Sequence, residues 1–127
     1  MTIEIEDLEI GIRKIKMAGQ SSAQSFSLEF LPSIADAIDK ALRDVSVKAI
    51  ILTGEGKFFS AGADINAFAK SIEDGNSPQL IRDLTGFLHP LLIRMRQSPT
   101  ISVAAINGAC AGGGLGLALA CDFRIGS

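Results

Sequence analysis

Hydrophobic and polar residues recur along the chain with periods that change from one segment to the next. Residues 10–17 alternate between apolar and polar, which favours a half-buried strand or one arm of a hairpin, although the phase slips once between Ile12 and Ile15. From about Ser27 to Val45 the apolar residues instead recur every third or fourth position, which predicts an amphipathic helix. The apolar face of that helix comprises Leu28, Leu31, Ile34, Ala35, Ile38, Leu42 and Val45.

Strands and helices are predicted to alternate through the rest of the chain. Residues 47–53 and 101–106 are nearly continuous apolar runs, typical of strands covered on both faces. Short helices are expected at 64–69 and 115–120, and a last strand begins at Asp122. This order is typical of an α/β fold with mostly parallel strands and right-handed crossover helices.

A second long helix is predicted to begin with Ser77 as its N-cap and Pro78 at its first position. Leucines at helical spacing continue the pattern, which ends at Met95. Pro90 lies inside this helix and should kink or split it near Gly86 to His89, because proline lacks the N–H that the helix ladder needs.

Composition narrows the functional classes. With 127 residues, 47% of them hydrophobic and 20% charged, we expect one globular domain spanning 1–127. The net charge of −2 and the scattered Lys and Arg residues argue against nucleic acid as a partner. Cys110 and Cys121 are expected to be buried and reduced, which fits a cytoplasmic protein. A single histidine and the lack of a CxxC pair argue against a metal site.

The uncharged stretch from Gln97 to Cys121 is long enough to span a bilayer. However, five glycines interrupt it, and each lowers helix stability by about 1 kcal/mol relative to alanine. A buried strand, a tight turn and a buried helix explain the stretch better, so we expect no membrane span. The acidic start of the chain does not resemble a signal peptide.

The glycine cluster between Gly108 and Gly114 follows a buried strand and precedes a helix. Such a turn presents unpaired backbone N–H groups at a helix N-terminus, where the dipole favours a negative oxygen. A phosphate-binding P-loop would need Lys and Ser or Thr after the last glycine, but the chain has Leu115 and Gly116 there. The dinucleotide fingerprint also fails in its spacing. An oxyanion hole, which needs only two converging N–H groups, remains, beside the alternative that the glycines merely let helix and sheet pack closely.

A second turn of small residues, Ser60 to Asp64, also follows a buried strand. Ligand sites in α/β sheets lie at the carboxyl ends of strands. If the two strands are neighbours, their turns can direct two N–H groups at one oxygen.

Three segments together resemble the enoyl-CoA hydratase/isomerase (crotonase) family: residues 57–65 (KFFSAGADI), 104–114 (AAINGACAGGG) and 119–122 (LACD). The match runs in register from about Ile10 to Ser127. The resemblance implies a crotonase-type spiral of ββα units that stops before the family's C-terminal helical region. It also implies an acyl-CoA or enoyl-CoA substrate, no bound cofactor other than coenzyme A as part of that substrate, and a trimer or hexamer for the full-length protein.

The resemblance also implies functional residues. It makes the backbone N–H groups of Ala63 and Gly113 an oxyanion hole that stabilises an enolate formed from the thioester. Asp64 orders the turn rather than moving protons. The residues implied to bind CoA are Ala61, Gly62, Ala63, Asp64, Ile65, Gly112 and Gly113, with weaker contacts from Ser22 and Ala23.

The chain departs from the family pattern at three places. Gly116 occupies the position of a catalytic glutamate, and glycine cannot transfer a proton. The second family glutamate and the closing helices would lie beyond Ser127. The loop around residues 18–25 lacks the family's Asn-Arg-Pro and Asn-Ala sequences, so the CoA contacts of Ser22 and Ala23 are the weakest part of the match.

The sequence therefore predicts an acyl-CoA-binding protein whose oxyanion hole supports double-bond isomerisation or hydration. The glycine at 116 favours isomerisation, which can run on one carboxylate, and a protein ending at Ser127 would show little or no catalysis. The alternative is a non-catalytic, truncated module that binds acyl-CoA or serves only structurally. A nucleotide-binding domain is a third reading, which the failed phosphate motifs disfavour.

Overall fold

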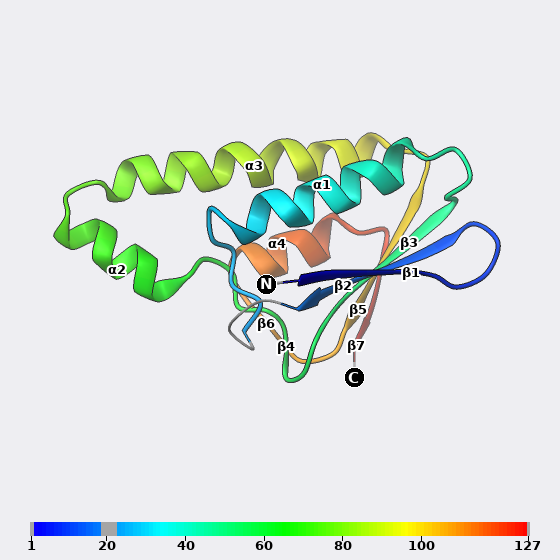
Figure 1. Ribbon diagram of the computed structural model, residues 1–127, viewed down its shortest axis with the longest axis horizontal. Coiled ribbons are helices and arrows are strands. Elements are labelled where there is room, and N and C mark those ends of the chain that lie inside the picture. The colour runs from blue at the N-terminus through cyan, green and yellow to red at the C-terminus, as the bar shows by residue number, and fades with distance from the viewer. Residues whose placement is uncertain (1, 19–22, 127) are drawn as a thin grey trace.

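A computed structural model describes residues 2–18 and 23–126 of the chain (Figure 1). Its main sheet has five strands in the order β1-β2-β3-β5-β7. β1 is antiparallel to β2, whereas the other neighbours are parallel, which confirms the predicted α/β class. The strands are β1 (Thr2–Asp7), β2 (Ile12–Ala18), β3 (Ala49–Gly54), β5 (Ile101–Ile106) and β7 (Phe123–Gly126).

Four helices connect these strands: α1 (Phe30–Arg43), α2 (Ile65–Glu73), α3 (Ser77–Gln97) and α4 (Gly113–Ala120). In Figure 1, α1, α3 and α4 lie on the same side of the sheet. The alternation in β2 and β3 directs every second residue at these helices, where Ile15 and Ile50 are fully buried. From α1 the core receives Leu31, Ile34 and Ile38, which fall on the face that the sequence predicts, and also Phe30, which that face did not include. Leu28 and Val45, which were predicted on that face, are exposed because they lie outside the helix.

A second, smaller sheet joins two turns that are far apart in the sequence. It pairs β4 (Phe58–Ser60) in parallel with β6 (Ala109–Cys110). Ala109 N–H donates to the Lys57 carbonyl at 3.0 Å, and Ala111 N–H donates to the Ser60 carbonyl at 3.0 Å. The turn that follows β3 and the turn that follows β5 are therefore bonded to each other directly.

Of the two outcomes predicted for Pro90, a kink or a split of the second long helix, the split does not occur. α3 runs unbroken from Ser77 to Gln97 with Pro90 inside it. Leu91 and Met95 follow the proline and are buried in the core. Leu88 precedes the proline and packs against the same core. This packing stabilises the helix before and after Pro90, although the proline removes one backbone hydrogen bond.

The start of α3 also differs slightly from the prediction. Asn76 is the N-cap and Ser77 is the first helical residue, with Pro78 in the first turn. The Asn76 side chain makes no capping hydrogen bond. Pro78 instead favours this start because its fixed φ suits a first turn and its missing N–H would have no partner there.

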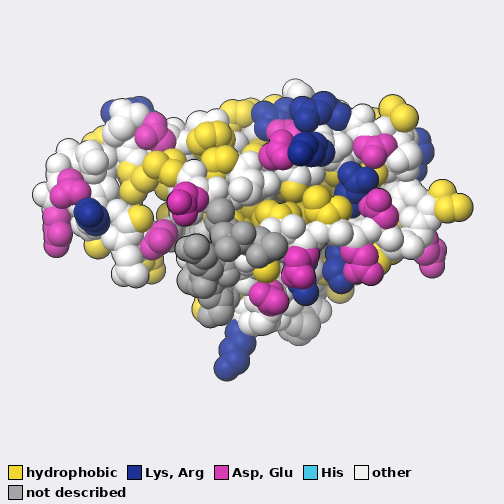
Figure 2. Space-filling model, in the orientation of Figure 1, with side chains coloured by type: hydrophobic (Ala, Val, Ile, Leu, Met, Phe, Trp, Pro, Cys, Tyr) yellow, Lys and Arg dark blue, Asp and Glu magenta, His cyan; other side chains and the backbone are white. Residues whose placement is uncertain are grey.

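α2 and the first turns of α3 project beyond the end of the sheet (Figure 1). Hydrophobic side chains gather between these two helices in Figure 2. In the described part of the chain no helix is long and apolar enough to cross a membrane.

Candidate active site

The turn after β4 is held by buried polar contacts. The Ser60 hydroxyl donates to the Gln24 carbonyl at 2.9 Å and accepts from Gly62 N–H at 3.1 Å. Gly62 adopts a φ of +85°, a conformation that favours glycine. Its carbonyl accepts from Phe26 N–H at 2.7 Å. These hydrogen bonds fix the backbone conformation between β4 and Ala63.

The turn after β6 begins helix α4. Gly112 is the N-cap and adopts a φ of +55°, and no side chain caps the helix. Gly113 is the first residue of the helix, so its N–H lies among the donors that a helix leaves without an internal partner.

The two turns touch each other. A Cβ on Gly62 would lie 2.9 Å from the Gly113 nitrogen and 2.9 Å from the Ala111 carbonyl oxygen. A Cβ on Gly114 would lie 2.7 Å from the Ser60 Cβ. All three distances are too short for a real side chain, so the close approach requires these glycines. Close packing, the alternative explanation of the glycine cluster, is thus confirmed at Gly114, and it also brings the two turns together.

Backbone donors on both turns lack an acceptor within the described part of the chain, and two of them are Ala63 N–H and Gly113 N–H. Among the described residues, neither Ala63 N–H nor Gly113 N–H donates to any protein oxygen. Ala63 is exposed and Gly113 is half-buried, so a ligand can reach both. Chemically, two such donors on adjoining turns are suited to a carbonyl oxygen that gains negative charge.

Asn107 fastens the bases of the two turns together. Its Oδ1 accepts from Gly54 N–H at 2.9 Å, and its Nδ2 donates to the carbonyls of Gly56 and Phe58 at 3.0 and 3.1 Å. Gly108 follows, and a Cβ there would collide with the Lys57 carbonyl. Sequence reasoning assigned no role to the side chains of Asn107 and Ser60. The role of Asn107 could have been suspected from the Asn-Gly pair at the end of a buried strand. No feature of the sequence points to the role of Ser60.

An apolar cavity of about 130 Å³ lies next to Ala63. It is lined from α2 by Ala67 and Phe68 and from α3 by Leu80 and Leu84. Phe26 also lines it, and the Phe26 ring would be 3.1 Å from a Cβ on Gly113, so the ring lies between the cavity and the start of α4.

Asp64 and Asp122 have structural partners. The Asp64 carboxylate accepts from Asn66 N–H at 2.9 Å and Ala67 N–H at 3.3 Å, which caps α2. This agrees with the expectation that Asp64 orders the turn. Asp122 accepts from Ser102 N–H at 2.9 Å and so anchors the junction between α4 and β7.

The remaining predicted site residues lie around this centre. Ala61 N–H donates to the Ala23 carbonyl at 2.9 Å, which places Ala23 beside the turn. Ile65 begins α2 and is 79% exposed. Gly116 lies in α4, and because it is glycine no side chain reaches the site from this position. A Cβ there would meet only Leu92 within 4 Å. Ser22 lies outside the described residues.

The two cysteines are free thiols. Burial raises the pKa of Cys121 to about 11 and also raises the pKa of Cys110. Both groups are therefore protonated near neutral pH, and neither is a nucleophile for this site.

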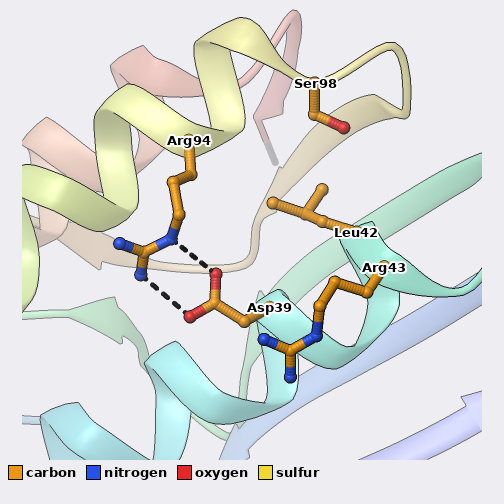
Figure 3. A pocket seen from close by; sticks show the side chains of 5 residues that line it. All are labelled: Asp39, Leu42, Arg43, Arg94 and Ser98. Carbon is orange, nitrogen blue, oxygen red and sulfur yellow. Dashed lines mark hydrogen bonds and ion pairs between the residues drawn. The ribbon is translucent and has the colours of Figure 1, made fainter.

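A second hollow, of about 480 Å³, lies between α1 and α3 (Figure 3). Arg43 and Arg94 line it, but the Arg94 guanidinium already makes two 2.8 Å contacts with the Asp39 carboxylate. This hollow adjoins the C-terminal end of α1, which leads into the amino end of β3. The glycine turns follow the carboxyl ends of the strands, so the hollow and the turns lie at opposite ends of the strands. The hollow shares no residue with the site.

Comparisons with known proteins match this architecture. The sequence model of the enoyl-CoA hydratase/isomerase family matches residues 7–127. The mitochondrial enoyl-CoA delta isomerase 1 of Homo sapiens is 38% identical over 102 residues, which are 80% of this chain and 32% of that protein. The 4-chlorobenzoyl coenzyme A dehalogenase-2 of an Arthrobacter species is 32% identical over 118 residues, 91% of this chain and 41% of that protein.

The fold matches as well. The crystal structure of an enoyl-CoA hydratase from Bacillus anthracis superimposes with a TM-score of 0.85 at 31% identity, covering 99% of this chain and 47% of that one. The chain thus spans a third to a half of the length of these relatives. The family model covers nearly the whole chain, and the strand order, the glycine turns and the superposition agree with it: this chain belongs to the enoyl-CoA hydratase/isomerase family.

Proposed function

We propose that the chain binds the thioester of an acyl-CoA, with the thioester oxygen accepting hydrogen bonds from Ala63 N–H and Gly113 N–H. The observation that carries this proposal is that both donors are unpaired within the described residues, on two turns in contact. Gly113 N–H is half-buried, so leaving it without a partner is unfavourable, and a bound oxygen would remove that cost. Ala63 is exposed, so its N–H is open to a ligand. The relatives whose names specify a CoA thioester support CoA as the carrier.

Negative charge on the thioester oxygen increases when a proton leaves the adjacent carbon and an enolate forms. Fixed donors stabilise that charge more than they stabilise the neutral thioester, which is the condition for catalysis rather than mere binding. The proposed chemistry is therefore proton transfer through an enolate, in which one carboxylate takes the proton from the carbon next to the carbonyl and returns it to the far carbon of the shifted double bond. The described residues of the site do not supply that carboxylate. Gly116 supplies no proton carrier, and the Asp64 carboxylate caps α2, so the site favours a double-bond shift over the two-carboxylate addition of water.

The apolar cavity next to Ala63 is the proposed site of the acyl chain. A cavity of comparable size holds a molecule of about six carbons, so we infer a short acyl group. The cavity wall on α2 adjoins the donor at Ala63, and this arrangement supports a substrate whose acyl chain lies in the cavity while its thioester lies at the donors.

The proposal is tested by a proline at the start of α4. Gly113→Pro removes one N–H, while a proline suits the first position of a helix. The preceding Gly112 has a ψ of −129°, outside the helical region that a following proline disfavours. Gly113→Ala adds a Cβ at the same place but keeps the N–H, so it controls for contacts with Phe26 and Leu88.

Calorimetry with butyryl-CoA and with CoA measures the effect. We expect wild type and Gly113→Ala to bind butyryl-CoA more tightly than CoA, and Gly113→Pro to lose about tenfold or more of that preference, the loss typical of a hydrogen bond to a partly charged oxygen. Equal affinities of wild type for the two ligands, or an unchanged preference in Gly113→Pro, would contradict the proposal.

A further inference from the structure

Ser60 makes an unusual set of contacts beneath the proposed oxyanion hole. The side chain is fully buried, and its hydroxyl uses both of its hydrogen-bonding roles on backbone atoms: it donates to the Gln24 carbonyl and accepts from Gly62 N–H. A buried hydroxyl that only filled space would be worse than a methyl group, because burial of an unpaired polar atom is unfavourable. Its two bonds therefore indicate a positioning role.

Both partners of this hydroxyl have left-handed backbone conformations. Gln24 has a φ of +50°, uncommon for a residue other than glycine, and Gly62 has a φ of +85°. Such conformations persist when the surrounding contacts hold them. Ser60 lies between the two, so its hydroxyl holds two segments, residues 23–26 and 60–64, in the arrangement that the turn requires.

The Gly62–Ala63 peptide links Ser60 to the donor. The described residues contain no cis peptide bond, so the Gly62 carbonyl and Ala63 N–H point in opposite directions from one rigid plane. The carbonyl is fixed by Phe26 N–H at 2.7 Å, and the nitrogen of Gly62 is fixed by the Ser60 hydroxyl at 3.1 Å. Holding both sides of Gly62 sets the direction of Ala63 N–H.

Ser60 also contacts the turn that carries the second donor. Its carbonyl accepts from Ala111 N–H at 3.0 Å, and its side chain lies against Gly114. One residue thus touches both turns, although neither of its polar atoms faces the open side of the site.

We propose that Ser60 is a positioning residue, whose hydroxyl directs Ala63 N–H at the thioester oxygen without touching the substrate. The inference rests on the proposed function, because it specifies how one of the two proposed donors is aimed. It predicts that loss of the hydroxyl weakens the bond from Ala63 while acyl-CoA still binds.

Ser102 provides a matched control. It is also buried, at 1% exposed, and its hydroxyl likewise donates once and accepts once, to the Asp122 carboxylate at 3.4 Å and from Asp122 N–H at 3.2 Å. It lies near the start of β5, whereas Asn107 and the glycine turn follow the end of that strand. Ser102→Ala therefore removes the same group from a similar environment away from the site.

The test is the amide proton shift of ¹⁵N-labelled protein saturated with butyryl-CoA, relative to saturation with CoA. In wild type and Ser102→Ala we expect the Ala63 and Gly113 amide protons to move downfield. In Ser60→Ala the shift at Ala63 should fall by about half or more, while Gly113 retains more of its shift, since a poorly aligned hydrogen bond weakens steeply. Ser60→Cys, whose thiol is a weaker donor, should give an intermediate value.

The outcomes separate the two claims. An Ala63 shift in Ser60→Ala and Ser60→Cys equal to that of wild type overturns the role of Ser60 but leaves the oxyanion hole intact. A wild-type protein that shows no downfield shift at either amide overturns the proposed function itself. If Ser60→Ala does not fold, Ser60→Cys decides the matter against wild type and Ser102→Ala.

Discussion

At the scale of single residues, Asn107 is the side chain that joins the two halves of the site. Its amide both accepts from Gly54 N–H and donates to two carbonyls, those of Gly56 and Phe58. The three partners lie at the end of β3, in the turn after it and at the start of β4, about fifty positions earlier in the chain. This connection adds to the backbone hydrogen bonds from Ala109 N–H and Ala111 N–H that join the same two segments.

Asn107→Asp should loosen the site. A carboxylate keeps the shape of the amide but cannot donate, so the carbonyls of Gly56 and Phe58 would face a negative oxygen. We expect the free energy of unfolding to fall by about 1–3 kcal/mol and the preference for butyryl-CoA over CoA to decrease. Urea titration and calorimetry measure these changes.

Asn76→Asp makes the same change at an exposed N-cap whose side chain makes no capping bond, so it controls for charge. If both variants were equally stable and bound butyryl-CoA like wild type, Asn107 would have no role in joining the turns.

Cys121 should be unreactive in the folded protein. Its pKa is raised to about 11 because burial disfavours the thiolate, which is the form that reacts. Between pH 7 and 9 almost all of the group is therefore a thiol, and the thiolate becomes abundant only as the pH approaches 11. We expect iodoacetamide to modify Cys121 much more slowly in buffer at pH 8 than in urea, as measured by peptide mass spectrometry. Equal rates in the two solvents would show that the thiol is accessible and ionised.

The residues of the site were predictable to different degrees. Gly112, Gly113 and Asp64 could be named because glycines at a strand-to-helix turn and an acid before a helix have local reasons to be there. The roles of Ser60 and Asn107 depend on hydrogen bonds to residues 36 and about fifty positions away. No spacing along the chain predicts such bonds, so they required the structure.

At the scale of elements, α3 shows how tertiary packing outweighs a local preference. The helix tolerates Pro90 because buried Leu91 and Met95 after it and half-buried Leu88 before it pack on one core. The unpaired carbonyl is that of Gly86, four residues earlier, on an exposed part of the helix.

Replacing this proline should therefore stabilise the protein. Pro90→Ala restores a ladder donor at an exposed position, and we expect the free energy of unfolding to rise by as much as about 3 kcal/mol. Gly86→Ala, where a Cβ meets nothing within 4 Å, should add about 0.5–1 kcal/mol through helix propensity alone. Urea titration distinguishes the two increments. A less stable Pro90→Ala protein would mean that the proline fits a bend on which the packing of α3 depends.

The four helices and the buried strands followed from the pattern of hydrophobic residues, whereas β1, β4 and β6 did not. β4 and β6 contain three and two residues, too few for any period to be detectable. β1 alternates apolar and acidic residues, but Ile5 is half exposed and the strand lies at the edge of the sheet, so burial gives it little pattern. The small β4–β6 sheet is nevertheless the element that brings the two donor turns together.

At the scale of the whole molecule, the site combines two donors with a cavity but lacks a proton carrier at residue 116. We therefore expect this chain to hydrate crotonyl-CoA no faster than the reaction without protein, because addition of water needs a group to deliver and a group to remove a proton. The loss of absorbance of the conjugated thioester measures the rate. Hydration clearly above that background would show that another acid of the chain reaches the bound thioester.

Whether two backbone N–H groups bind a thioester oxygen can be measured from the infrared carbonyl stretch of bound butyryl-CoA. With a ¹³C label at that carbonyl, we expect the stretch to move to lower frequency on binding to wild type and to Gly113→Ala, because hydrogen bonds weaken the C=O bond. The displacement should be smaller with Gly113→Pro, which lacks one donor. If butyryl-CoA binds to the wild-type protein and its carbonyl stretching frequency does not change, the thioester oxygen does not accept these hydrogen bonds.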